Sequence, residues 1–102
     1  MIMDKISIKQ LMDAAPYPEA GLRLYELARP LIVSDMPVKM DLSGVESLPT
    51  LFMNMSFGKL IAEFGKPKVM VALKFYAISK VQLERIKRYF QQFDPSFSNL
   101  VK

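Results

Sequence analysis

The sequence contains no cysteine and no histidine. It therefore offers no disulfide, no thiolate nucleophile, no imidazole base and none of the usual ligands of transition metals. The four glycines are scattered, and no Lys-Ser or Lys-Thr pair follows any of them, so a phosphate-cradling nucleotide loop is excluded. Paired carboxylates on a recognisable element are missing as well. We expect a protein that is not an enzyme and that needs no cofactor.

Long apolar runs are also missing. The most apolar stretch, residues 49–65, is interrupted by Asn54, Ser56, Lys59 and Glu63, whereas a membrane-spanning helix needs about 20 predominantly apolar residues. The N-terminus lacks a basic region followed by a long apolar run and a cleavage site. We expect a cytoplasmic protein without a membrane partner, and the absence of cysteine is compatible with that location.

The length of 102 residues predicts a single domain over residues 1–102, with residues 94–102 as a loose tail. The net charge of +4 is unevenly distributed, with −2 on residues 1–50 and +6 on residues 51–102. A basic second half is typical either of a solvated surface or of a face that binds polyanions.

The hydrophobic pattern predicts alternating strands and helices. A Ser-x-x-Gln capping box at Ser79 marks the strongest helix, and Pro30 is expected to end or kink the first one. The predicted elements are an edge strand at 4–11, a helix at 18–29, a strand at 38–42, a helix from Pro49 to Gly65, a doubly covered strand at 66–75 and a helix at 79–93.

This order favours an α/β sandwich with a mixed or partly parallel sheet of about three or four strands and about three helices, because strands joined by helices must cross over. The predicted core is apolar throughout. Its members are Phe52, Met55, Leu60, Phe64, Val69, Val71, Leu83, Ile86 and Phe90.

Three carboxylates lie close together in the sequence, at Asp35, Asp41 and Glu46. A hard-cation site built on them is conceivable. Asp41 is explained more simply as a residue at the end of a strand that bonds the backbone of the Ser43-Gly44 turn. We therefore predict no metal site.

The stretch from Asp41 to Gly65 reads DLSGVESLPTLFMNMSFGKLIAEFG, and VALKFYAISKVQLERIKRYFQQF follows it. In order and spacing this part of the chain resembles the STAS-like domain of unknown function, a prokaryotic and phage-associated relative of the sulphate-transporter and anti-sigma-factor-antagonist (STAS) domains. The features that carry the resemblance are Asp41, Gly44-Val45, Pro49-Thr50, Phe52, Asn54, Gly58, Leu60, Phe64-Gly65 and Lys74-Phe75.

The resemblance implies a regulatory switch. In anti-sigma antagonists a serine at the start of the helix after the central strand is phosphorylated by a histidine-kinase-type ATPase, and Thr50 is the hydroxyl at that place here. The surrounding turn departs from the family pattern, since Pro49, Leu51 and Phe52 replace its aspartate, second serine and glycine. Thr50 is thus either a phospho-acceptor or a helix N-cap.

These observations favour a non-catalytic protein-interaction module of STAS-like type. Its partner would be a protein, of the histidine-kinase-type ATPase class or another regulatory factor, and the predicted partner-binding residues are Glu46, Ser47, Leu48, Thr50 and Leu51. Two alternatives stay open. One is a nucleic-acid-binding protein that uses Lys80, Arg85, Lys87 and Arg88, and the other is a phage-encoded inhibitor of a host protein. The oligomeric state is not indicated.

Overall fold

The computed structural model describes residues 5–93 and contains one sheet of three parallel strands in the order β1-β2-β3. The strands are β1 (Ile6–Ser7), β2 (Val38–Asp41) and β3 (Leu73–Tyr76). The helices are α1 (Ile8–Ala14), α2 (Tyr17–Val33), α3 (Thr50–Met53), the π-helical η1 (Asn54–Gly58), α4 (Lys59–Phe64), α5 (Lys66–Ala72) and α6 (Lys80–Gln91). The predicted α/β class with a parallel sheet is confirmed, although the helical segments outnumber the three expected. The predicted loose tail, residues 94–102, lies outside the described residues.

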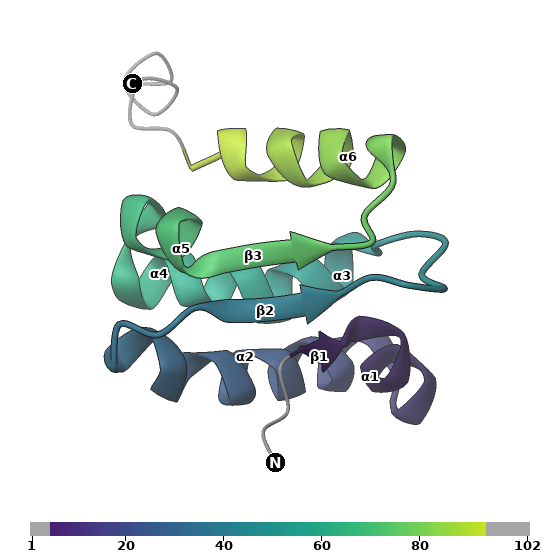
Figure 1. Cartoon of the computed structure of the whole chain (residues 1–102), viewed down its shortest axis with the longest axis horizontal. Helices are drawn as coiled ribbons and strands as arrows, with labels where there is room; N and C mark the ends of the chain where they lie inside the picture. The colour runs from purple at the N-terminus through teal and green to yellow at the C-terminus, as the bar shows by residue number, and fades with distance from the viewer. Residues whose placement is uncertain (1–4, 94–102) are drawn as a thin grey trace.

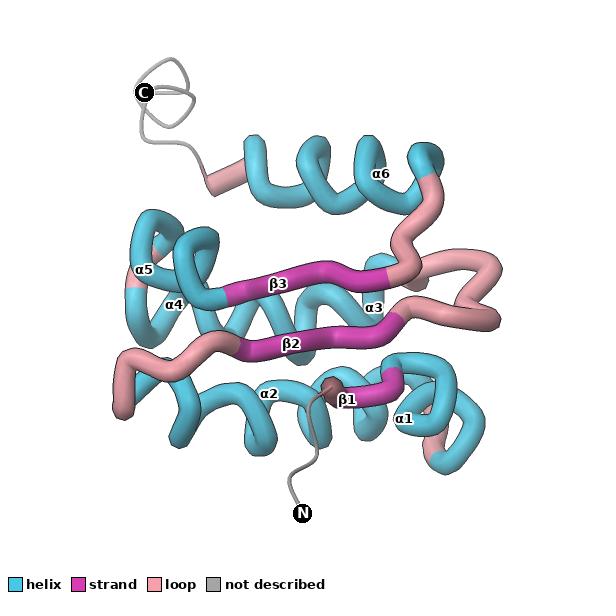
Figure 2. Tube along the Cα trace, in the orientation of Figure 1, coloured by secondary structure: helices cyan, strands magenta, loops and turns pink. Residues whose placement is uncertain are grey.

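Helices α2, α3 and α4 lie on one face of the sheet, and α6 lies along its β3 edge (Figure 1). In Figure 1, α2, α3 and α4 lie behind the strands, and α6 runs alongside β3. On β2 and β3 the buried residues are Val38, Met40 and Leu73. Lys39 of β2 and Lys74 of β3 alternate with them and are not buried. Figure 2 shows the β2–α3 connection and the β3–α6 connection at the same end of the molecule, where the strands finish. Parallel strands therefore bring both connections together at their carboxyl ends.

One continuous helical stretch, α3–η1–α4, forms the centre of the core, as the apolar run at 49–65 predicted. Ser56 is buried within it, and its hydroxyl donates to the carbonyl oxygen of Phe52 at 2.8 Å, so the polar group is satisfied. The ring of Phe57 packs edge-to-face against Phe75 of β3 and Phe90 of α6, at centroid distances of 6.1 and 5.7 Å. Phe57 thus joins the sheet, the central helix and α6.

Helix α2 packs closely against this stretch. A Cβ at Gly21 would lie 2.4 Å from the carbonyl oxygen of Phe52, so only glycine allows the two backbones to approach in this way. Glu63 of α4 accepts hydrogen bonds from the Tyr25 hydroxyl and from Arg29 Nε, the latter at 2.7 Å. These bonds lower the pKa of the Glu63 carboxyl, with Tyr25 as the larger cause. They fix the angle between the helices at the solvent edge of the contact.

The first strand is shorter than predicted. Only Ile6–Ser7 pairs with β2, and the chain enters α1 at Ile8. The hydroxyl of Ser7 accepts from the backbone N–H of Gln10 at 3.3 Å, which makes Ser7 a helix N-cap. The alternation that predicted a strand at 4–11 was wrong beyond Ser7 because this cap offers the backbone a helical alternative.

The predicted strand at 66–75 is also wrong in its first part, since residues 66–72 form α5 and only Leu73–Tyr76 is a strand. Gly65 has a φ of 89°, which ends α4, and Pro67 lies in the first turn of α5, where its missing N–H costs nothing. The expected burial on both faces is absent, because the side chain of Val71 is 73% exposed.

Helix α2 continues through Pro30 to Val33 instead of ending at Arg29. A proline inside a helix removes one backbone hydrogen bond and normally costs stability. Here the added turn buries Ile32, and the backbone N–H of Ser34 bonds to the Pro30 carbonyl at 3.1 Å. Tertiary packing of the last turn therefore outweighs the local preference.

Most of the predicted core is confirmed. Phe52, Leu60, Val69, Ile86 and Phe90 are buried, and Val71 is the clear error. Three further residues, Met55, Phe64 and Leu83, are only partly buried. Within residues 5–93, no helix is both long enough and apolar enough to cross a membrane.

We expect Phe57→Ala to lower the free energy of unfolding by about 3 to 5 kcal/mol, because it empties the contact between three elements. Val71→Ala is the matched control and should change it by less than about 0.5 kcal/mol, since the side chain faces solvent. Urea denaturation followed by circular dichroism measures both values. A large loss at Val71 would show that the assignment of α5 as a helix with an exposed outer face is incorrect.

Candidate functional site

The connection between β2 and α3 begins with a tight turn. The carboxylate of Asp41 accepts hydrogen bonds from the backbone N–H of Ser43 at 2.9 Å and from its hydroxyl at 2.7 Å. Both bonds lower the pKa of the Asp41 carboxyl, the hydroxyl more than the amide. Gly44 follows with a φ of 78°. The predicted role of Asp41 in the Ser43-Gly44 turn is confirmed.

Within residues 5–93, the three carboxylates considered from the sequence are not gathered into one cluster. Asp35 precedes β2 and Asp41 ends it, so the strand separates two of the three carboxylates considered from the sequence. Across the described residues, no group of three or more Asp, Glu, His or Cys side chains is arranged to hold a metal ion.

Helix α6 holds the connection in place through two side chains. Gln82 donates from Nε2 to the carbonyl oxygen of Val45, and Arg85 donates from Nε to the carbonyl oxygen of Leu48 at 2.6 Å. Gln82 also completes the capping box with Ser79 at the start of α6, as the sequence predicted. One turn of α6 thus provides hydrogen-bond donors for two loop carbonyl groups, each 37 residues from its donor in sequence.

Thr50 is exposed at the start of α3, and its hydroxyl oxygen accepts a hydrogen bond from Arg85 Nη2 at 3.0 Å. The N-cap of α3 is Pro49, and no side chain caps this helix. The interpretation of Thr50 as a helix N-cap is therefore wrong. Its hydroxyl is directed at α6 instead, where Arg85 contacts both Thr50 and the preceding loop.

One helical turn further on, the hydroxyl of Tyr89 donates to Asn54 Oδ1 at 2.8 Å. Burial raises the pKa of the Tyr89 phenol. A Cβ on Gly58 would lie 2.8 Å from the Tyr89 hydroxyl, so the absence of a side chain at Gly58 lets the phenol reach the central helix. Asn54 and Gly58 are the first and last residues of η1, and π-helical turns frequently mark functional sites.

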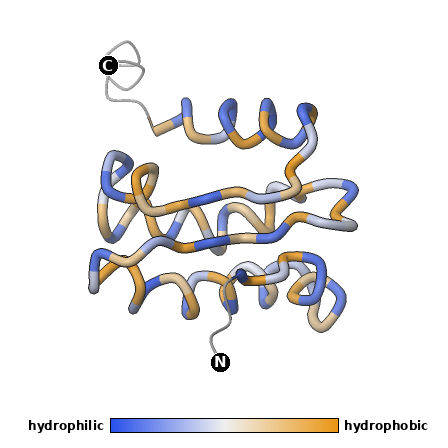
Figure 3. Tube along the Cα trace, in the orientation of Figure 1, coloured by the Kyte–Doolittle hydropathy of each residue, from blue (hydrophilic) through white to orange (hydrophobic). Residues whose placement is uncertain are grey.

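A groove of about 530 Å³ lies between α3 and α6. It contains three cationic side chains and one carboxylate together with apolar surface, including Val81, which is 78% exposed. In Figure 3 the side of α6 away from the sheet is mostly blue and the side facing the sheet is mostly orange. The hydrophilic residues of α6 therefore lie mainly on its solvent side. The lining residues are Thr50, Met53, Lys80, Val81, Glu84, Arg85, Arg88, Tyr89 and Gln92.

The structure brings together residues from the two sites predicted from the sequence. Thr50, from the predicted partner-binding set, lines the same groove as three residues of the predicted nucleic-acid-binding set, Lys80, Arg85 and Arg88. Lys87 points to a different face of α6, where it lines a second, more apolar groove with Met70 of α5 and Leu83. The sequence could not show that the two alternative sites share one location.

Three residues of the predicted partner surface lie elsewhere or differ in exposure. Glu46 and Ser47 line a separate polar hollow beside α1, which contains Lys9 and Asp13. Leu48 was expected to form part of the apolar centre, but its side chain is 1% exposed and belongs to the core. Leu51 is exposed, as a contact residue must be.

Sequence reasoning missed the hydrogen bond from Gln82 to the Val45 carbonyl and the one from Tyr89 to Asn54. The available signal was the polar character of Gln82 on the inner, buried side of α6. A buried polar side chain needs a partner, but the sequence does not name it.

The family model described as the STAS-like domain of unknown function matches residues 20–82. The chain belongs to this family, and the STAS-like α/β fold expected from the resemblance is confirmed. The matched residues run from α2 to the first turn of α6 and include Thr50, whereas Arg85 and Arg88 lie beyond them. No curated protein and no solved structure matches the chain significantly.

We expect Arg85→Gln to release the loop before α3, because the bond to the Leu48 carbonyl and the bond to Thr50 are both lost. A hydrogen bond from a charged donor contributes about 1 kcal/mol or more, so amide exchange in residues 43–50 should accelerate by about five-fold or more. Arg88→Gln removes the same charge from the same groove and serves as the control, since Arg88 holds no part of the loop among the described contacts. Equal exchange rates in both variants would contradict the role assigned to Arg85.

Proposed function

We propose that the chain is a non-catalytic regulatory module that docks to a protein partner through the groove between α3 and α6. The observation that carries the proposal is the pair of hydrogen bonds from Arg85, to the Leu48 carbonyl at 2.6 Å and to the Thr50 hydroxyl at 3.0 Å. Through them a loop at the carboxyl end of the sheet and a basic helix form one continuous surface. Loops at this edge of an α/β sheet are free to recognise ligands, because strands and helices are committed to the core.

The composition of the groove supports a protein partner. Val81 of α6 is a large apolar side chain left exposed in the groove, and Met53 of α3 lines the groove with it. The cations of Lys80, Arg85 and Arg88 surround this apolar surface. An apolar centre with a polar rim that contains arginine is typical of protein interfaces.

Membership of the STAS-like family supports a finer proposal, in which Thr50 is phosphorylated by a partner of the histidine-kinase-type ATPase class. The Thr50 hydroxyl is exposed, and Arg85 already donates to it. A phosphate there would form charge-assisted hydrogen bonds with Arg85 and would lie at the start of a helix, where negative charge is stabilised. The added charge would change the partner surface at its centre.

The absence of histidine and cysteine from the sequence supports the non-catalytic part of the proposal. Nucleic-acid binding by α6 is the second candidate, favoured by the three cations that line the groove. Lys87, the fourth residue of that candidate, lines a different face of α6.

The test is a pull-down from a lysate of the source organism, with wild-type protein and two variants, followed by identification of bound proteins by mass spectrometry. Thr50→Glu introduces a negative charge into the groove, and the double variant Arg85→Glu/Arg88→Glu reverses its cations. We expect both variants to lose a regulatory protein, such as an ATPase of the class named above, that the wild type retains. Thr50→Glu should change the free energy of unfolding by less than about 0.5 kcal/mol, because Pro49 and not Thr50 is the N-cap and the new carboxylate still offers Arg85 an acceptor.

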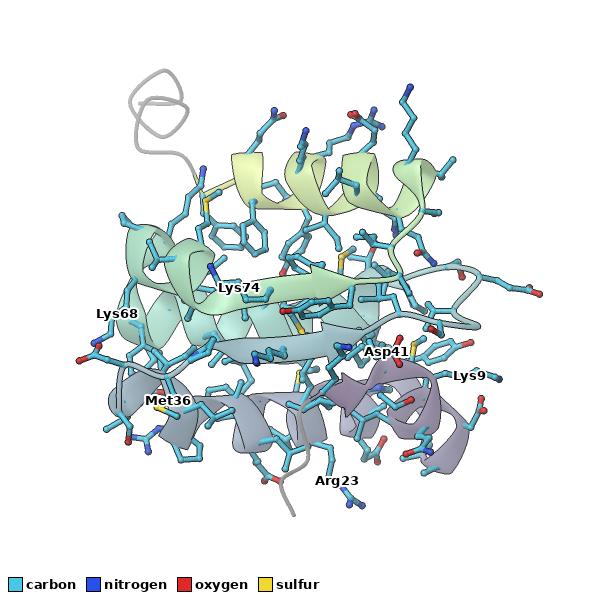
Figure 4. All side chains as sticks on the ribbon, viewed as in Figure 1. Lys9, Arg23, Met36, Asp41, Lys68 and Lys74 are labelled. Atoms are coloured by element: carbon cyan, nitrogen blue, oxygen red, sulfur yellow. The ribbon has the colours of Figure 1, made fainter. Side chains whose placement is uncertain are left out.

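Arg23→Glu is the control, since Arg23 lies on α2 at the edge of the molecule away from α6 (Figure 4). It should retain the partner. If only the Arg85/Arg88 reversal abolishes capture, the loop and Thr50 are not part of the docking surface and the basic helix alone is functional. Capture that survives in all variants would contradict the groove as the docking site.

A further inference from the structure

Residues 5–93 leave one face of the sheet, the face opposite α2, α3 and α4, without a covering helix (Figure 1). No described helix crosses in front of β2 and β3 in Figure 1. Parallel sheets are normally covered on both faces and consist of continuous apolar runs. Here β2 and β3 alternate instead, with Val38 and Met40 directed to the core and Lys39 and Asp41 to the other face.

The register places lysines next to one another on this face. Lys39 of β2 is directly opposite Lys74 of β3. Ile6 pairs with Met40, so Lys5, one residue before β1, lies beside Lys39. Neighbouring strands are about 4.8 Å apart, and the three Cα positions therefore span about 10 Å. The blue segments of β2 and β3 in Figure 3 lie side by side at this register.

A second row of polar residues follows the lysine row towards the carboxyl ends of the strands. It contains Ser7, Asp41 and Tyr76, which the register also aligns. Figure 4 shows Asp41 and Lys74 on the near side of the ribbon. Tyr76 is 37% exposed, and the ammonium group of Lys5 lies 4.6 Å from the centre of its ring. The only carboxylate of this row, Asp41, is bonded to Ser43.

The lysine row costs stability. Like charges directly opposite each other on adjacent strands are unfavourable. Between the described residues, Lys39 and Lys74 have no ion pair, and Lys5 is near one opposite charge, the Asp41 carboxylate, whose pKa it helps to lower. Polar but uncharged side chains would keep the face equally well hydrated. Features that break a local rule without a structural gain tend to mark functional sites.

We propose that this open face binds single-stranded nucleic acid, with the lysine row (Lys5, Lys39 and Lys74) on the phosphates and the ring of Tyr76 against a base. Binding moves the Lys5 ammonium from its place over the Tyr76 ring to a phosphate. A flat sheet face that combines cations with an exposed aromatic ring is the arrangement that single-strand binders use. A second copy of the chain does not fit face to face, because it would place lysines against lysines. An anionic membrane surface would attract the same lysines, and competition by anionic vesicles in the test below distinguishes it from nucleic acid.

This site is distinct from the groove between α3 and α6. Phe90 of α6 packs against Phe57, which packs in turn against Phe75 on the core side of the sheet. The proposal therefore goes beyond the docking function and does not depend on it. It assigns Lys39 and Lys74 to recognition, whereas the sequence had pointed only to basic residues of α6.

The test is fluorescence anisotropy with a labelled 20-nucleotide oligodeoxythymidine and the full chain, over a series of salt concentrations. Three phosphate contacts on a single strand predict that log K falls against log salt with a slope of about −2. The double variant Lys39→Gln/Lys74→Gln should reduce the slope to about −0.7 and weaken binding correspondingly. Tyr76→Leu should weaken binding by about five-fold or more without changing the slope, because stacking on the ring is lost.

The control Lys68→Gln/Lys87→Gln removes the same charge from other surfaces and should bind like the wild type. A second control, Lys80→Gln/Arg88→Gln, tests the groove separately. Loss of binding in either control, or an unchanged affinity in Lys39→Gln/Lys74→Gln, would overturn the proposal. It would also be overturned if Tyr76→Leu binds normally, or if polyglutamate or anionic vesicles compete as well as unlabelled oligonucleotide at equal charge concentration.

Discussion

The guanidinium of Arg85 is the contact on which the functional end of the molecule depends. It donates to a carbonyl in the loop after β2 and to the hydroxyl that begins α3, groups that are 37 and 35 residues away in sequence. Without this contact the loop would have an unpaired carbonyl, and α6 would touch the rest of the chain mainly through its apolar side. Arginine suits this position because its planar group carries several donors in a fixed geometry.

Other side chains of α6 also bond the loop after β2 and the central helix. Gln82 bonds the loop one turn earlier, and Tyr89 bonds Asn54 one turn later. Phe90 packs between these polar residues and the core, with its ring 5.7 Å from that of Phe57. Apolar packing therefore places α6, and three polar side chains determine its register against α3 and the loop. A groove with defined walls results, and both the proposed docking surface and the proposed phospho-switch belong to it.

The sequence predicted what local patterns and burial determine. The Asp41 turn and the capping box at Ser79 depend on residues two or three positions apart. The α/β class and the buried central helix follow from the hydrophobic pattern of each segment. All four predictions are confirmed. The errors arise where a local pattern competes with a cap or with packing. The polar–apolar alternation around Ser7 predicted a strand, but Ser7 caps a helix instead. Pro30 did not end α2, because the following turn buries Ile32 in the core. The candidate site was predicted in two halves, since nothing in the spacing of Thr50 and Arg85 reveals a contact over 35 residues. The lysine row depends on strand register, which the sequence specifies only once the true ends of β1 and β3 are known.

The central claim is that α6 and the start of α3 form one unit through Arg85 and Thr50. A double-mutant cycle on the free energy of unfolding tests it most directly, with Arg85→Gln, Thr50→Val and the combined variant measured by urea denaturation. Residues in direct contact show interaction energies of about 0.5 kcal/mol or more, and we expect a value of about 0.5 to 1 kcal/mol for this pair. Additivity within about 0.3 kcal/mol would mean that the two residues do not interact and would contradict the account.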